Sequence, residues 1–277
     1  LSLHDALPIL LKPGHQVGLL SRFSVGDNGL GRTGMVTVAG KTDTFDNGGG
    51  LGALLGISGT RTYATYKNGG GRSSEEFIGE DNKYLRQEPR SQLYKINFNV
   101  DQFNRFEFSG RNYRNSFTRR DISSDDYYLR YNYAPLNELV EFNVLASTSR
   151  GNQAYKPESL YNFNDSSTTN KSNALDMNNT SRFRITDDLY AAFQLGGKLM
   201  DTRYSRRFVQ DTETDHNAFA PAGKQKIASL YSGLTLNKDI YQLDLNLNYT
   251  RSRVQGYKPA CADNEKCFPQ GATQLNV

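Results

Sequence analysis

Hydrophobic and polar residues alternate with a period of two along several segments of the chain. In IYQLDLNLNYT (240–250), Tyr and Leu occupy the odd positions from Tyr241 to Tyr249, and polar residues lie between them. Side chains of a strand point alternately to its two faces, so the pattern places one face in an apolar medium and the other in water. The same alternation recurs at residues 94–100, 127–133, 140–147 and 191–202.

Turn residues between these segments divide the chain into eleven predicted strands. They cover residues 14–27, 33–44, 50–66, 90–100, 104–117, 124–134, 138–151, 174–186, 189–206, 224–237 and 239–257. Several exceed about 10 residues, the length that a tilted strand needs to cross a bilayer. The last residues, FPQGATQLNV (268–277), read as a loop without a further strand, so we expect a fragment cut at its C-terminal end.

The connections between the predicted strands alternate in length. Tight turns are expected at 101–104, 134–139, 186–189 and 237–239, and long polar loops at 67–89, 152–173 and 208–223. A soluble sandwich explains any single alternating strand but has no reason to keep this parity. Outer-membrane barrels require it, because their periplasmic turns are short and their extracellular loops are long.

Composition agrees with a membrane barrel and excludes two other classes. Hydrophobic residues make up 36% of the chain and the mean hydropathy is −0.67, although aromatic residues reach 12%. No run of about 18 apolar residues is present, which excludes a transmembrane helix. The net charge of +4 mixes both signs without a basic block, so we expect no nucleic-acid partner. The sequence therefore predicts an all-β, antiparallel transmembrane β-barrel in the bacterial outer membrane, in contact with its lipid.

The face of the predicted strands that is expected to contact water carries many ionic residues. Small barrels pack their interior with side chains, so this number of inward charges favours a wide lumen filled by water or by a plug. The residues predicted to face the lumen are Lys95, Glu107, Arg130, Glu141, Arg182, Arg184, Lys198 and Asp244. Tyrosines near strand ends are expected in the aromatic girdles, namely Tyr63, Tyr66, Tyr113, Tyr190, Tyr204 and Tyr257.

Three stretches carry a resemblance to a known family. LKPGHQVGLLSRFSVGDNGLGRTGMVTVAGKT (11–42) resembles the passage from plug to first hairpin in TonB-dependent outer-membrane receptors. GGGLGALLGISGTRTYATYKNGGG (48–71) and PRSQLYKINFNVDQFNRFEFSG (89–110) resemble the next strands of the haem and haemophore branch. The resemblance implies a 22-stranded barrel, of which residues 10–277 supply about the first eleven strands, the N-terminal half. The plug domain and the box that the TonB energy-coupling complex pulls are absent from this stretch.

The first nine residues, LSLHDALPI, resemble a translated sequencing adapter. They lack the basic region, uninterrupted apolar stretch and cleavage site of a secretory signal. We therefore expect residues 1–9 to be an artefact and exclude them from every site.

Few residues offer site chemistry. His216, in the loop QDTETDHNAF, is a candidate haem ligand, although a lone loop histidine is most often solvated. Cys261 and Cys267 favour a disulfide over a metal site, because no second ligand pair accompanies them. The acidic runs DTETDH and SSDD (123–126) could suggest Ca²⁺, but neither has the spacing of a dedicated loop, and solvated charge is preferred.

Three functions remain open at this point. No nucleophile, base and orienting group occur together, so we expect a non-enzyme without a permanent cofactor. The resemblance favours a receptor that imports haem, taken free or from haemoglobin or a haemophore. A receptor for a ferric siderophore or another nutrient is the first alternative, and a passive porin or structural barrel is the second.

Overall fold

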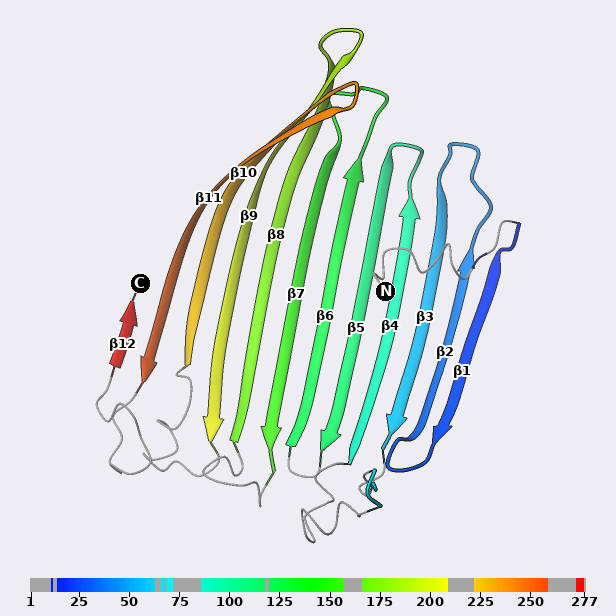
Figure 1. Cartoon of the computed structure of the whole chain (residues 1–277), viewed down its shortest axis with the longest axis vertical. Helices are drawn as coiled ribbons and strands as arrows, with labels where there is room; N and C mark the ends of the chain where they lie inside the picture. Colours follow the sequence, from blue (N-terminus) through cyan, green and yellow to red (C-terminus); the bar gives the residue numbers. More distant parts are fainter. Residues whose placement is uncertain are drawn as a thin grey trace.

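The computed structural model describes residues 11, 14–62, 66–67, 69–71, 86–117, 120–156, 166–208, 222–258 and 273–276. These residues form one antiparallel sheet of twelve strands, hydrogen-bonded in chain order, β1-β2-β3 through to β12 (Figure 1). The strands are β1 (Val17–Gly26), β2 (Gly31–Lys41), β3 (Gly50–Arg61), β4 (Gln87–Asn99), β5 (Asn104–Phe117), β6 (Arg120–Tyr133), β7 (Phe142–Tyr155), β8 (Ser166–Arg184), β9 (Leu189–Phe208), β10 (Ala222–Lys238), β11 (Tyr241–Lys258) and β12 (Thr273–Asn276).

The later strands are longer than a bilayer requires. β8 has 19 residues and β9 has 20, against 10 in β1. At about 3.3 Å per residue such strands extend for about 60 Å, roughly twice the hydrocarbon thickness of a membrane. The later strands therefore project beyond the lipid as well as through it.

The eleven predicted strands are all present, and the prediction for the C-terminal residues is wrong. Residues 273–276 do not lie in a loop, because β12 pairs with β11 through contacts such as Gln255 with Asn276. The predicted loop 152–173 is also too long. Residues 152–155 belong to β7 and residues 166–173 to β8, where they continue the ladder beyond the predicted strand ends.

The tight turns lie at one end of the sheet, the upper end in Figure 1. In the turn between β4 and β5, Asp101 accepts hydrogen bonds at 2.7 Å from the backbone amides of Phe103 and Asn104. Hydrogen bonds from the Asn104 side chain and the Phe103 amide hold the pKa of Asp101 below its ordinary value. Between β10 and β11 only two residues remain, and Asp239 takes a positive φ of 51°, as a two-residue hairpin turn requires.

The opposite end of the sheet contains the long connections and two short ones. Residues 62–86, 156–165, 209–221 and 259–272 join consecutive strands there, and so do the brief connections 27–30 and 118–119. The predicted alternation of short turns and long loops therefore holds at the tight-turn end. At the other end it is broken by two connections, 27–30 and 118–119, that are as short as periplasmic turns.

The apolar face of the sheet is exposed, and no second layer covers it within the described residues. Leu230, Leu247 and Tyr249 expose 65%, 75% and 69% of their surface. A sandwich would bury this face against another sheet. Only four hydrophobic residues of the described chain are buried, namely Leu11, Ala39, Leu54 and Ala191. Such a face requires an apolar environment from outside the chain.

No helix among the residues that the structure describes is long and apolar enough to cross a membrane.

Candidate functional site: the polar face of the sheet

The register places all eight ionic residues predicted for the lumen on one face of the sheet. One continuous row of paired residues crosses the strands from β5 to β9: Glu107, Arg130, Leu145, Asp176 and Lys198. A second row joins Arg182, Ala192, Thr235 and Asp244. The remaining members, Lys95, Glu141 and Arg184, occupy equivalent alternate positions on β4, before β7 and on β8. In a closed barrel, the face opposite the lipid lines the lumen.

Lys95 and Glu107 form a buried ion pair on this face. The Lys95 Nζ lies 3.1 Å from the Glu107 Oε2, and the two side chains expose 3% and 13% of their surface. Tyr128 donates a hydrogen bond of 2.6 Å to the other oxygen of Glu107. The Arg130 guanidinium lies 6.0 Å from the centroid of the Tyr128 ring. This cluster ties β4, β5 and β6 together through charge-assisted hydrogen bonds.

A second cluster spans β8, β9 and β10. Tyr231 reaches across β9 and donates a hydrogen bond of 2.6 Å to Asp176, although its hydrogen-bonded neighbours in the sheet are on β9 and β11. Its ring passes over Gly196, where an added Cβ would lie 2.4 Å from the ring carbon Cζ. Asn178 donates to the Tyr231 hydroxyl at 3.3 Å. Only glycine at position 196 leaves room for this crossing.

Four of the remaining predicted charges lie near the tight-turn end of the sheet, namely Glu141, Arg182, Arg184 and Asp244. Arg182 forms an ion pair of 2.5 Å with Glu141, and Arg184 forms one of 2.9 Å with Asp187. Asp244 accepts hydrogen bonds of 2.7 Å from Thr235 and Gln242. Lys198 is exposed and lies opposite Asp176 in the register. The polar face is therefore a network of pairs whose members come from neighbouring strands.

Sequence reasoning missed several members of this network. Asp126 accepts hydrogen bonds from Arg111 at 3.0 Å, Ser124 at 2.9 Å and Ser149 at 2.5 Å. The period of two already assigned Asp126 to the wet face, since it is an even position of β6 like Arg130. Asp125 and Asp126 of SSDD are partly exposed and form ion pairs with Arg114 and Arg111 on opposite faces of β6, partners that the sequence did not indicate.

The expected aromatic girdle is partly wrong. Tyr113, Tyr190 and Tyr204 lie on the polar face, as their pairing with Ser124, Asn237 and Gly223 shows. The apolar face instead carries a different set of aromatic residues, some in contact across strands: Tyr94, Phe98, Phe106, Tyr127, Tyr131, Tyr241 and Tyr249. Tyr66 lies outside the strands, and Tyr63 and the side chain of Tyr257 lie outside the described residues.

The start of the described chain packs on the polar face. Leu11 is buried against Ala39 and Leu54, at positions of β2 and β3 that share this face with Lys95. Beside it lies a cavity of about 630 Å³ whose lining includes Lys41, Asn97 and Glu107. The side-chain oxygen of Asn97 is buried and has no hydrogen-bond partner in the described structure.

The remaining sequence candidates lie outside the described residues. These are His216 with the run DTETDH, the cysteines Cys261 and Cys267, and residues 1–9. Their predicted roles as haem ligand, disulfide and adapter artefact stay predictions.

The crossing of Tyr231 over Gly196 makes a testable prediction. Gly196→Ala should displace the Tyr231 ring and break its bond to Asp176, at a cost of about 1–3 kcal/mol in the free energy of unfolding of the protein. Gly197→Ala is the matched control, since its Cβ would meet Leu230 at an ordinary 3.4 Å. Equal stability of the two variants in urea unfolding would rule out the steric account.

An antiparallel sheet of long strands with one exposed apolar face, one ion-paired polar face and tight turns at one end is the wall of an outer-membrane β-barrel. No family model matches the chain. In sequence, it is 23% identical over 206 residues to a probable TonB-dependent receptor of Haemophilus influenzae, across 62% of this chain and 22% of the relative.

Two solved structures share the fold. The Serratia marcescens hemophore receptor HasR, solved as a double mutant in complex with its hemophore HasA and heme, matches 97% of this chain with a TM-score of 0.75 and 18% identity. The siderophore receptor PiuA from Acinetobacter baumannii matches 96% with a TM-score of 0.63 and 13% identity. The chain spans 41% and 46% of these two structures. The comparisons confirm the predicted resemblance to TonB-dependent receptors and the outer-membrane location.

Proposed function

We propose that this chain forms part of the barrel wall of a receptor that takes up haem, free or presented by a carrier protein, and passes it to the periplasm. The observation that carries the proposal is the extent of the match to HasR. It covers 97% of the chain at a TM-score of 0.75, against 0.63 for PiuA, so the fold of this chain superposes more closely on the hemophore receptor. We propose a transport role for it and no catalytic one.

The polar face supports uptake through a filled lumen. Its charges are held in pairs such as Lys95 with Glu107 and Arg182 with Glu141, which fixes the wall before any ligand arrives. Buried Leu11 and the adjacent cavity support the proposal that this face accepts further polypeptide. We propose that a plug domain from outside this chain fills the lumen and is moved by a TonB energy-coupling complex.

Haem binding by the whole receptor tests the proposal. Titration of haemin into purified receptor in detergent should give a saturable change in the Soret absorbance, and ferric catecholate should not compete. Saturable binding of the ferric catecholate without haem binding would replace the proposal with siderophore uptake, the function in the printed name of PiuA. An open, ligand-independent conductance in planar bilayers would instead indicate a passive porin.

The candidate ligand His216 can be tested in the same titration. If His216 ligates haem, His216→Ala should weaken haemin binding and shift the Soret maximum, because an axial nitrogen is lost. His15→Ala is the control, since His15 precedes β1 outside the strands. An unchanged spectrum in His216→Ala would remove this residue from the site and leave the barrel assignment intact.

A further inference from the structure

A row of cations crosses the apolar face of the sheet beyond the end of its hydrophobic band. Arg150, Lys171, Arg203 and Lys224 occupy directly paired positions on β7, β8, β9 and β10. All four side chains are exposed. Each shares its face with the last residue of the hydrophobic band on its own strand, which lies four positions away toward the tight-turn end.

The row lies just beyond the hydrophobic band. On β8, β9 and β10 the band ends at Leu175, Leu199 and Ala228, which are paired with one another. The next alternate positions toward the long-connection end are Asn173, Asp201 and Lys226, followed by the row itself. On β11 the band ends at Tyr249, and Arg251 and Arg253 follow on the same face. The cations therefore lie where headgroups of the outer leaflet meet the barrel.

The protein itself neutralises little of this charge. Asp201 lies 3.1 Å from Arg203 and 4.0 Å from Lys226. Asp125, paired with Arg150 in the register, is held at 2.9 Å by Arg114. Within the part of the chain that the structure describes, no ion pair is formed by the cations that remain, Arg150, Lys171, Lys224, Arg251 and Arg253.

Adjacent like charges lower the stability of a sheet. Residues directly opposite one another have Cβ atoms about 4.5–5.5 Å apart, and like charges in such pairs are destabilising. Four consecutive strands each place a cation in this row. An external anion that bridges them removes the repulsion.

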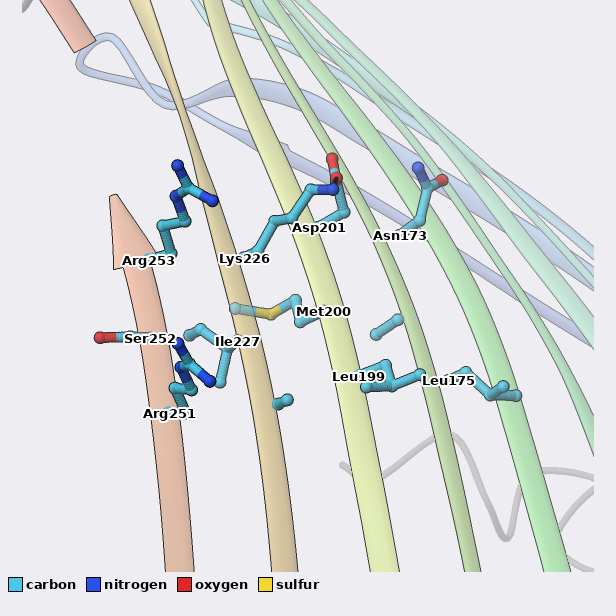
Figure 2. A pocket seen from close by; sticks show the side chains of 12 residues that line it. Asn173, Leu175, Leu199, Met200, Asp201, Lys226, Ile227, Arg251, Ser252 and Arg253 are labelled. Carbon is cyan, nitrogen blue, oxygen red and sulfur yellow. Dashed lines mark ion pairs between the residues drawn. The ribbon is translucent and has the colours of Figure 1, made fainter. Parts of the chain in front are cut away.

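An open groove connects this charge to the hydrophobic band. Its volume is about 590 Å³, and its lining includes Leu175, Leu199 and Ala228 together with Lys226, Arg251 and Arg253 (Figure 2). Figure 2 shows Lys226 directed toward Asp201, with the two arginines on the neighbouring strand. The groove thus offers an apolar surface on the membrane side and cations on the solvent side.

We propose that this surface binds a phosphorylated lipid of the outer leaflet, with its phosphate groups among the cations and an acyl chain along the groove. Neighbouring strands lie about 4.8 Å apart, so one phosphate reaches cations of two or three strands. A soluble anion gains nothing from contact with the apolar side chains of Leu175 and Leu199. Their presence beside the cations therefore favours a lipid. The inference is independent of the transported ligand, because this surface faces away from the lumen.

Native mass spectrometry of the whole receptor in detergent tests the proposal with diphosphoryl lipid A as the probe. We expect Lys171→Gln/Lys224→Gln to weaken lipid A binding by about tenfold or more, and Lys171→Arg/Lys224→Arg to keep it. Lys41→Gln/Lys198→Gln is the charge-matched control, because both lysines are exposed and lie on the polar face. A thermal midpoint measured for each variant separates misfolding from lost binding.

Further arms distinguish the source of the phosphate. Lipid A from which the phosphates have been removed should bind at least about tenfold more weakly than the diphosphoryl form, and inorganic phosphate at the same concentration should not displace it. Equal affinity of the Gln and control variants would overturn the proposal. Equal affinity for dephosphorylated lipid A, or displacement by inorganic phosphate, would also overturn it.

Discussion

Replacing Lys95 with methionine should lower the free energy of unfolding of the whole receptor by about 3 kcal/mol, because Glu107 loses the buried cation that lies against its carboxylate. Lys95 is 3% exposed and its ammonium lies 3.1 Å from the Glu107 carboxylate. Tyr128 also donates to Glu107, and Arg130 lies opposite Glu107 in the register, but neither replaces the ammonium buried between β4 and β5. Urea unfolding in detergent measures the change.

Two further variants show whether the cost comes from the unpaired charge. Lys95→Met/Glu107→Gln removes both charges and should recover a large part of the stability, since no buried ion remains. Lys198→Met removes an exposed lysine from the same face and should change stability by less than about 1 kcal/mol. If Lys95→Met is no less stable than Lys198→Met, the ion pair does not organise this wall.

Leu245→Arg should destabilise the inserted receptor by about 2–4 kcal/mol, the cost of an arginine at the bilayer midplane. Leu245 is the central residue of the alternating run from Tyr241 to Tyr249 on β11, and 52% of its surface is exposed. Its partner in the register is Leu234 on β10. An exposed leucine loses little packing on replacement, so the effect measures the environment outside the sheet.

Asn246→Arg is the matched control, since its position is one residue further along on the polar face. It should change stability by less than about 1 kcal/mol, because its guanidinium remains in water. Refolding into lipid vesicles followed by denaturant titration gives both values. Equal costs at positions 245 and 246 would contradict the assignment of the two faces.

The sequence predicts strands best where one face meets lipid. β5 begins and ends where predicted, at residues 104 and 117, because Phe106 and Phe108 alternate with charged positions and turn residues bound the run. The face of each ionic residue follows from the same alternation. Lipid therefore imposes a pattern that one strand displays without knowledge of its neighbours.

Beyond the membrane this signal disappears. Residues 166–173 of β8, SSTTNKSN, are polar on both faces, so nothing in their own sequence separates a strand from a loop. They are strand residues because β7 and β9 continue beside them and supply backbone hydrogen bonds. β12 is defined in the same way by its pairing with β11.

Contacts across strands need the register as well as the face. Tyr231 and Asp176 are 55 residues apart, and only the stagger of β8, β9 and β10 brings the hydroxyl within 2.6 Å of the carboxylate. The sequence does not indicate why position 196 must be glycine, because the Tyr231 ring that occupies the space beside it belongs to another strand. Side-chain partners therefore follow from the structure and not from the sequence pattern.

The central claim is that one face of this sheet contacts lipid and the other an aqueous lumen. Nitroxide labels at single cysteines introduced in turn at positions 243–248 of β11, with Cys261 and Cys267 replaced by serine, test it in the whole receptor in lipid vesicles. We expect collision rates with oxygen to peak at 243, 245 and 247, and collision rates with a polar nickel complex to peak at 244, 246 and 248. Rates without this period of two, or with the opposite phase, would contradict the account.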